Sequence, residues 1–164
     1  MLLFSLGAVV AQWSELYSRH PLLQSGVMFV HIAALVTSGG LAIATDRVIL
    51  RSGGEDEAAR RLHLKDMRRT HRTVTTGLGL VFASGLLQFL ADLDTFLGSK
   101  VFWGKMILVG ALLVNGLLML RAETAVERDP ASDVGWSRLR RVAAASVTLW
   151  MLITLAGATL VNVQ

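Results

Sequence analysis

The chain has 164 residues, of which 53% are apolar and 17% are charged, and it contains no cysteine. Soluble domains average about 45–50% apolar and about 25% charged residues, so this balance is typical of a membrane protein. The absence of cysteine excludes a disulfide scaffold, a cysteine-ligated metal centre and a cysteine nucleophile. The basic residues gather at the ends of apolar segments, and we therefore expect no nucleic-acid partner.

Four continuous apolar segments predict four transmembrane helices, at residues 22–45, 73–91, 101–120 and 142–162. Each approaches the length of about 20 residues that crosses about 30 Å of hydrocarbon at a rise of about 1.5 Å per residue. The apolar residues are continuous rather than alternating, which excludes a membrane β-barrel. We therefore predict an all-α membrane protein, a bundle of four transmembrane helices over residues 21–164.

Within residues 1–20, the stretch MLLFSLGAVVAQW is apolar but too short to span a bilayer, and no basic residue precedes Arg19 as a signal peptide would require. Residues 1–20 predict an N-terminal interfacial helix on the outer face, with Trp13 and Tyr17 at the level of the lipid headgroups. Residues 55–72 begin with three acidic residues, which favour a helix N-terminus. We expect this segment to extend the second span into the cytoplasm as a helix.

The distribution of Lys and Arg predicts the orientation of the bundle. Residues 47–72 carry eight basic side chains and residues 121–141 carry five, whereas the remaining connections carry few. Because basic loops stay on the cytoplasmic side, both segments are expected there. The two termini and the short 92–100 turn are then outside. The sequence thus predicts a multi-pass protein of the bacterial inner (plasma) membrane, surrounded by the lipid bilayer.

Polar side chains at bilayer depth are the candidate site residues, because each is costly there unless it is paired or functional. Counted at about 1.5 Å per residue, His31 lies about 5 Å to the outer side of the midplane. Other polar or soft groups fall within a few ångströms of the same level: Gln88, Lys105, Met106, Thr154 and Thr159. Four helices are therefore expected to contribute to one layer in the outer half of the bundle.

His31 is the leading ligand candidate, because a neutral imidazole binds haem iron, copper or zinc. The alternative is a structural histidine that is hydrogen-bonded to a neighbouring helix, through Gln88 or a carbonyl. Lys105 is expected to be a second haem ligand, a cation for a haem propionate, or a lysine that reaches the outer interface. Met106 fits core packing, with a thioether ligand to haem iron as the alternative.

His71 is placed about 17 Å to the inner side of the midplane, too far from His31 for the two to ligate one metal. Asp46 and Arg47 are expected to form an ion pair at the inner interface. Asn115 is expected to make a hydrogen bond between helices. Glycines recur on three of the helices, where they fit either close helix packing or room for a flat cofactor.

The run HIAALVTSGGLAIATDR, from His31 to Arg47, resembles the first core helix of small bacterial four-helix membrane proteins of unknown function. The stretch from Thr76 to Glu123 resembles their second and third helices. The layout is also similar to HemJ-type protoporphyrinogen oxidases, which have a histidine in an early helix and a lysine near the start of a later one. That resemblance implies that His31 binds haem b and that Lys105 is essential. The histidine-containing helix also resembles CopD-type copper-resistance proteins.

The sequence therefore predicts a haem b-binding membrane protein with His31 as the metal ligand and with Gln88, Lys105 and Met106 around the cofactor. The expected role is electron transfer involving quinol or a partner protein. Two alternatives belong to other classes. One is a HemJ-like tetrapyrrole oxidase, and the other is a cofactor-free accessory subunit or scaffold that packs against a larger membrane complex or against further copies of itself.

Overall fold

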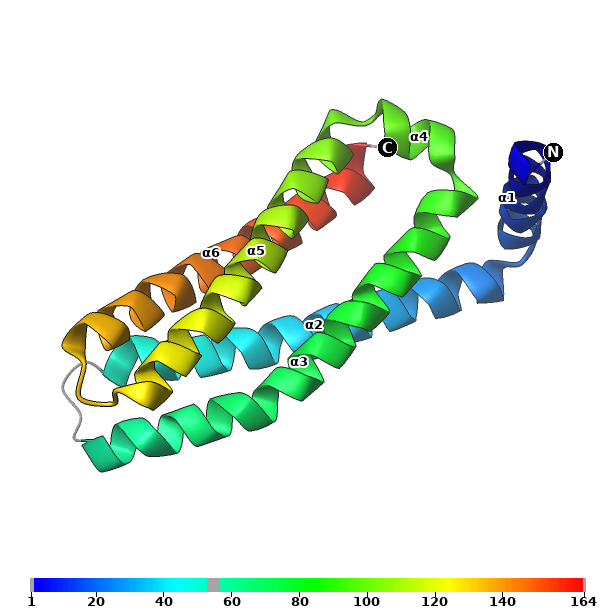
Figure 1. Cartoon of the computed structure of the whole chain (residues 1–164). Helices are drawn as coiled ribbons and strands as arrows, with labels where there is room; N and C mark the ends of the chain where they lie inside the picture. The colour runs from blue at the N-terminus through cyan, green and yellow to red at the C-terminus, as the bar shows by residue number, and fades with distance from the viewer. Residues whose placement is uncertain (1, 53–56, 164) are drawn as a thin grey trace.

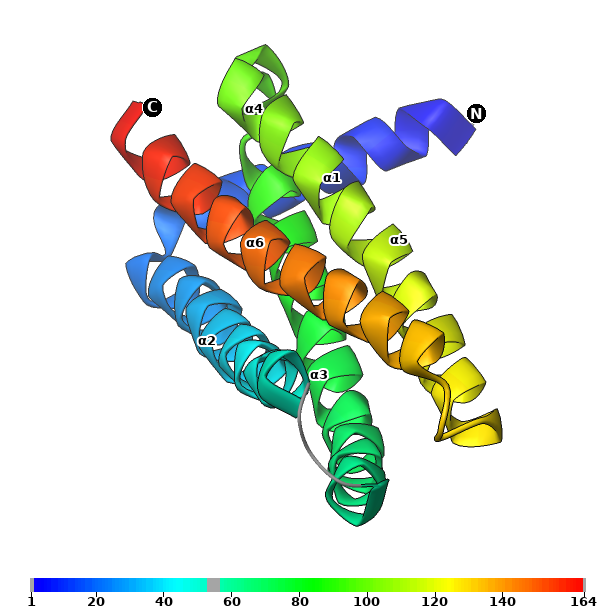
Figure 2. The same ribbon diagram turned by 90° about the vertical axis from the view of Figure 1, so that its left-hand side faces the viewer.

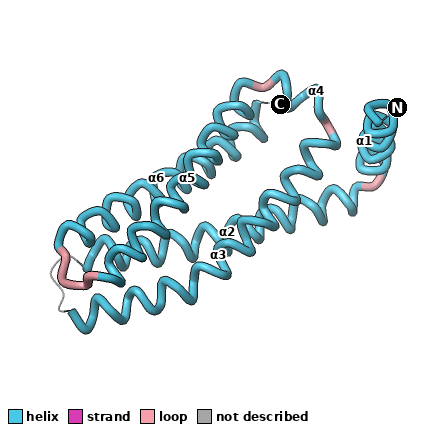
Figure 3. The backbone as a smooth tube through the Cα atoms, viewed as in Figure 1, coloured by secondary structure: helices cyan, strands magenta, loops and turns pink. Residues whose placement is uncertain are grey.

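A computed structural model describes residues 2–52 and 57–163, and nearly all of this part of the chain is helical (Figure 3). No strand occurs among these residues. The helices, in chain order, are α1 Leu2–Arg19, α2 Pro21–Arg51, α3 Glu57–Ala91, α4 Leu93–Gly98, α5 Lys100–Arg128 and α6 Asp133–Val163. The prediction of an all-α fold is confirmed.

Four segments of the described chain are long and apolar enough to cross a membrane, namely Pro21–Arg51, Thr70–Ala91, Lys100–Arg128 and Asp133–Leu160. Three of them contain a predicted span whole, and the fourth contains residues 142–160 of the last predicted span. The expectation of four apolar helices of sufficient length is therefore confirmed. The helices are longer than the spans, because their backbone hydrogen bonding continues into the charged flanks. Of residues 55–72, predicted as a helical extension of the second span, residues 57–72 form one continuous helix with it in α3. Residues 55 and 56 lie outside the described residues.

The helices run up and down, so that the loops alternate between the two ends of the bundle (Figures 1 and 2). The connection between α5 and α6 lies at the same end of the bundle as the last turn of α2 and the first turn of α3 (Figure 1). We call this the loop end. Both chain termini and α4 lie at the opposite end, which we call the terminal end. The two arginine-rich segments identified in the sequence therefore share one end of the bundle.

Side-chain caps define the tight turns between helices. The Asp92 carboxylate accepts a hydrogen bond from the Thr95 backbone at the start of α4. The Ser99 hydroxyl accepts one from the Phe102 backbone at the start of α5. At α2, Pro21 occupies the first helical turn, where its missing N–H costs nothing. These residues end one helix and start the next within one or two positions, so the chain changes direction sharply there.

Close contacts between helices occur where glycine replaces a side chain. A Cβ atom on Gly77 would lie 2.7 Å from the Cβ of Ser38, so α3 approaches α2 closely at this point. A Cβ atom on Gly39 would lie 2.9 Å from Cε3 of Trp150, where α2 meets α6. Of the two explanations for the glycines, close helix packing is therefore the one that these two positions show.

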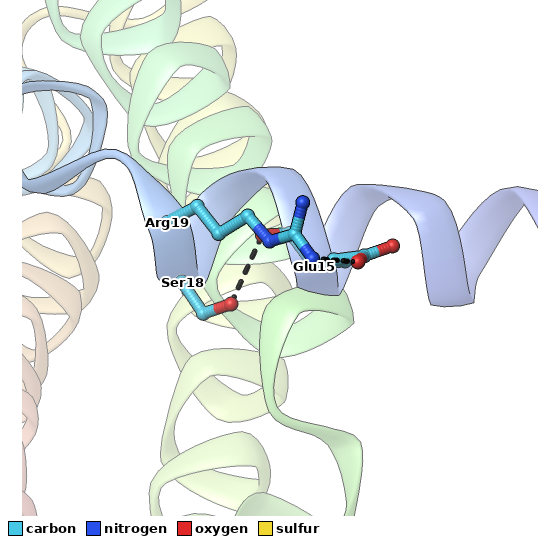
Figure 4. Close-up of polar contacts among 3 residues, drawn as sticks. All are labelled: Glu15, Ser18 and Arg19. Atoms are coloured by element: carbon cyan, nitrogen blue, oxygen red, sulfur yellow. Dashed lines mark hydrogen bonds and ion pairs between the residues drawn. The ribbon is translucent and has the colours of Figure 1, made fainter.

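Helix α1 runs across the bundle at the terminal end rather than along it (Figure 2). The indole of Trp13 donates a hydrogen bond of 2.8 Å to the Leu87 carbonyl, and the Ser14 hydroxyl donates one of 2.7 Å to the Ala91 carbonyl. Ala91 ends α3, so Ser14 satisfies one of the carbonyls that a helix end leaves unpaired. The last turn of α1 carries an exposed ion pair between Glu15 and Arg19 (Figure 4).

Candidate functional site

His31 is joined to the neighbouring helix by a side-chain hydrogen bond. Its Nδ1 lies 3.0 Å from the hydroxyl oxygen of Ser84, which α3 presents to α2. The backbone of Val81, one turn away on α3, also interacts with the imidazole ring. The sequence predicted Gln88 or a backbone carbonyl as the partner and did not indicate Ser84. The Gln88 amide instead donates to the Ser84 carbonyl of its own helix, at 3.3 Å.

The hydrogen bonds of Ser84 determine which ring nitrogen of His31 carries the proton. The Ser84 hydroxyl lies 2.6 Å from the Leu80 carbonyl, which can only accept. The single hydroxyl proton is used there, so Ser84 accepts a hydrogen bond from Nδ1 of His31. A neutral imidazole protonated at Nδ1 has its lone pair at Nε2. This arrangement, with one nitrogen oriented by a neighbour and the other left basic, is the usual one for a metal-ligating histidine.

The ring of His31 also depends on a glycine. A Cβ atom on Gly85 would lie 3.3 Å from Cε1 of His31 and 3.7 Å from its Nδ1. The first of these distances is tighter than an ordinary van der Waals contact, so a larger residue would displace the ring. Ser84 and Gly85 thus fix the imidazole together, one by a hydrogen bond and the other by leaving space.

Lys105 reaches the level of His31 from the other pair of helices. Helices α2 and α6 are antiparallel and meet at Gly39 and Trp150. His31 precedes Gly39 by eight residues on α2, and Ala158 follows Trp150 by eight residues on α6. Because the two helices are antiparallel, His31 and Ala158 lie at the same level of the bundle. The amine of Lys105 is placed against the adjacent Gly157, whose Cβ would lie 3.6 Å from Nζ. His31 and Lys105 also interact electrostatically.

The other members of the predicted layer make different contacts. Met106 is 37% exposed, so much of its side chain lies at the surface of the bundle. The Thr154 and Thr159 hydroxyls donate to the Trp150 and Leu155 carbonyls of their own helix. The structure thus brings His31 and Lys105 to one level and adds Ser84, which the sequence reasoning missed.

A second polar group lies nearer the loop end, around Asp46 of α2. The Asp46 side chain is only 4% exposed and is hydrogen-bonded to the Ser146 hydroxyl of α6. Arg47 is exposed, and the described residues include no ion pair between the two. The expected Asp46–Arg47 ion pair is therefore wrong. Consecutive residues on a helix point about 100° apart, so one faces the bundle while the other faces outward.

Asp46 lines a cavity of about 130 Å³ that is shared by α2, α3, α5 and α6. His71 lies on the same wall of α3 as Thr70 and Thr75. His71 and Ser84 are thirteen positions apart on α3, about 20 Å at 1.5 Å per residue, so this cavity is well separated from His31. Asn115, also on the cavity wall, donates its amide proton to the Val142 carbonyl at 3.2 Å. The predicted interhelical hydrogen bond of Asn115 is thereby confirmed.

Within the described ranges, no group of three or more His, Cys, Asp or Glu side chains gathers as a metal site would require. A cofactor that brings its own ligands to the metal, as a porphyrin does, needs only one or two protein ligands. Comparison with known protein families, characterised proteins and solved structures finds no match. The function of this protein is therefore inferred from its own residues.

Proposed function

We propose that this protein binds haem b within the membrane, with Nε2 of His31 as an axial ligand. The observation that carries the proposal is the hydrogen bond between His31 and Ser84. It fixes the ring, places the proton on Nδ1 and leaves a lone pair on Nε2. A histidine that only joined two helices would gain nothing from this second, basic nitrogen at bilayer depth, where an unsatisfied polar atom is costly.

The donor set fits one haem. His31 supplies an imidazole from the α2–α3 pair, and Lys105 supplies an amine from the α5–α6 pair at the same level. The two helix pairs diverge toward the terminal end (Figure 1). Lys105 extends along α6 to Gly157, and an ammonium group in this position suits a haem propionate, which forms strong charge-assisted hydrogen bonds. Met106 is the weaker candidate, because much of its side chain lies at the surface of the bundle.

The role that follows is one-electron transfer to or from a quinol or a partner protein in the membrane, since a bound haem supplies reversible one-electron chemistry. The protein contributes the axial ligand, the burial and the hydrogen bond from His31 to Ser84. All three act on the redox potential of a haem. Ser84 makes the imidazole a stronger electron donor at Nε2, because its hydroxyl accepts a hydrogen bond from the N–H group at Nδ1.

The proposed placement has the loop end in the cytoplasm of a bacterial cell and both termini outside. The support is the gathering of basic residues at the loop end. Helix α1 is proposed to lie in the outer interface, because it crosses the terminal end at a steep angle to the four long helices (Figure 2). It exposes apolar side chains such as Val9 and carries a charged pair, Glu15 and Arg19, at its end.

The proposal is tested by the reduced-minus-oxidised absorption spectrum of the protein purified in detergent from cells supplied with a haem precursor. Wild-type protein is expected to show the Soret and α bands of a b-type haem, and His31→Ala is expected to lack them. His20→Ala is the matched control, because His20 is an exposed histidine near the same end of the bundle. A wild-type spectrum without a Soret band, after haem has also been added to the purified protein, would overturn the proposal.

A further inference from the structure

The cavity near the loop end contains a carboxylate that the protein does not fully satisfy. Oδ2 of Asp46 is buried and has no hydrogen-bond partner among the described residues, while the same side chain is hydrogen-bonded to Ser146. Removing a carboxylate from water is costly unless a donor or an opposite charge compensates. The structure therefore leaves room for a complementary positive group.

The described part of the chain does not provide this group. None of the described residues that line the cavity is Lys or Arg. Arg47 follows Asp46 directly, but it is exposed on the other face of α2. His71 is the one other titratable side chain on the described walls of the cavity. No permanent positive charge pairs with Asp46 within the described walls, and a cationic ligand would supply one.

The walls suit an organic cation better than a metal ion. A hard cation such as Ca²⁺ takes about six to eight oxygen ligands, which replace its water shell. Asp46 is the one carboxylate among the described residues of the cavity wall. Much of the remaining wall is apolar and includes Leu78, Leu112, Met119 and Trp150. Such walls accommodate the carbon atoms of an ammonium ligand.

Trp150 adds a specific reason for an ammonium group. The face of an indole attracts cations, and quaternary ammonium ligands are recognised in this way in other proteins. The volume of about 130 Å³ is close to that of an engineered cavity of about 150 Å³ that binds benzene, a ligand of six heavy atoms. From these observations we propose that the cavity binds a compact organic ammonium ion, with Asp46 as its counter-ion and Trp150 in its wall.

This site is independent of the proposed haem, and it is tested with tetramethylammonium chloride as the probe. The unfolding temperature of the purified protein is measured against probe concentration, with sodium chloride at equal concentration as the salt control. Wild-type protein is expected to show a saturable rise of about 3–6 °C at ten times the dissociation constant. Sodium chloride alone is expected to give no saturable rise.

Asp46→Asn keeps the shape of the side chain and removes its charge, and it should weaken binding of the probe at least about tenfold. Asp94→Asn is the matched control, because Asp94 is an exposed aspartate at the terminal end, and it should bind as wild type does. The proposal is overturned if wild-type protein shows no saturable response, whatever the stability of Asp46→Asn. An equal response to sodium chloride, or an undiminished response of folded Asp46→Asn, would also overturn it.

Discussion

Nδ1 of His31 lies 3.0 Å from the hydroxyl oxygen of Ser84, and this hydrogen bond joins α2 to α3 within the apolar part of the bundle. Ser84 is buried and donates its own proton to the Leu80 carbonyl. The contact between the two side chains therefore has two effects. It holds two helices together, and it determines the tautomer of the histidine. The same pair gives the first prediction.

Ser84→Ala removes the acceptor at Nδ1 and leaves the helix backbone unchanged. If His31 ligates haem, the ring loses its orientation and its donor strength. Hydrogen-bond partners of a metal-ligating histidine typically account for a factor of about 10–100 in metal affinity, so we expect haem binding to weaken by this factor. Titration of haem into the purified protein measures the change. Ser25→Ala is the control, because Ser25 is exposed on the same helix as His31, and a loss of equal size there would argue against the account.

Gly77→Ala should destabilise the bundle, because the new Cβ would lie 2.7 Å from the Cβ of Ser38. Overpacking of this kind costs about 1–3 kcal/mol in the free energy of unfolding. Gly79→Ala is the matched control, since a Cβ there meets no atom within 4 Å. It should be neutral or stabilising by up to about 1 kcal/mol, because alanine favours helix. Unfolding in mixed detergent measures both variants, and equal effects would contradict the close packing of α2 on α3.

The absence of native cysteine makes single-cysteine reporters of topology unambiguous. Asp94→Cys lies at the terminal end, and Ala131→Cys lies between α5 and α6 at the loop end, both at exposed positions. In intact spheroplasts, a membrane-impermeant maleimide is expected to label the first variant but not the second. Permeabilised membranes should show labelling of both. The reverse pattern would invert the proposed orientation.

The four spans and the level of His31 and Lys105 could be predicted from the sequence, because both depend only on position along a helix. Hydropathy locates the spans, and a constant rise per residue gives the depth. Asn115 could be predicted in the same way, since a lone amide in an apolar helix needs a partner on its neighbour. Its bond to the Val142 carbonyl of α6 meets that expectation.

The rotation of each helix about its own axis could not be predicted from the sequence. For this reason the sequence did not indicate Ser84 or the inward orientation of Asp46. Ser84 and Gln88 are four positions apart on one helical face, so the sequence could not decide between them as the partner of His31. Asp46 was expected to face Arg47, whereas helix rotation turns it into the bundle toward Ser146. The signal that could have suggested this is the carboxylate itself, about five residues inside the end of a long apolar helix.

The central claim, that His31 holds a haem, is tested most directly by titrating haem into the purified protein and following the Soret band. Wild-type protein and His20→Ala are expected to bind haem saturably, while His31→Ala gives only the spectrum of free haem. Saturable binding by His31→Ala with the wild-type spectrum, or no saturable binding by the wild-type protein, would contradict the account.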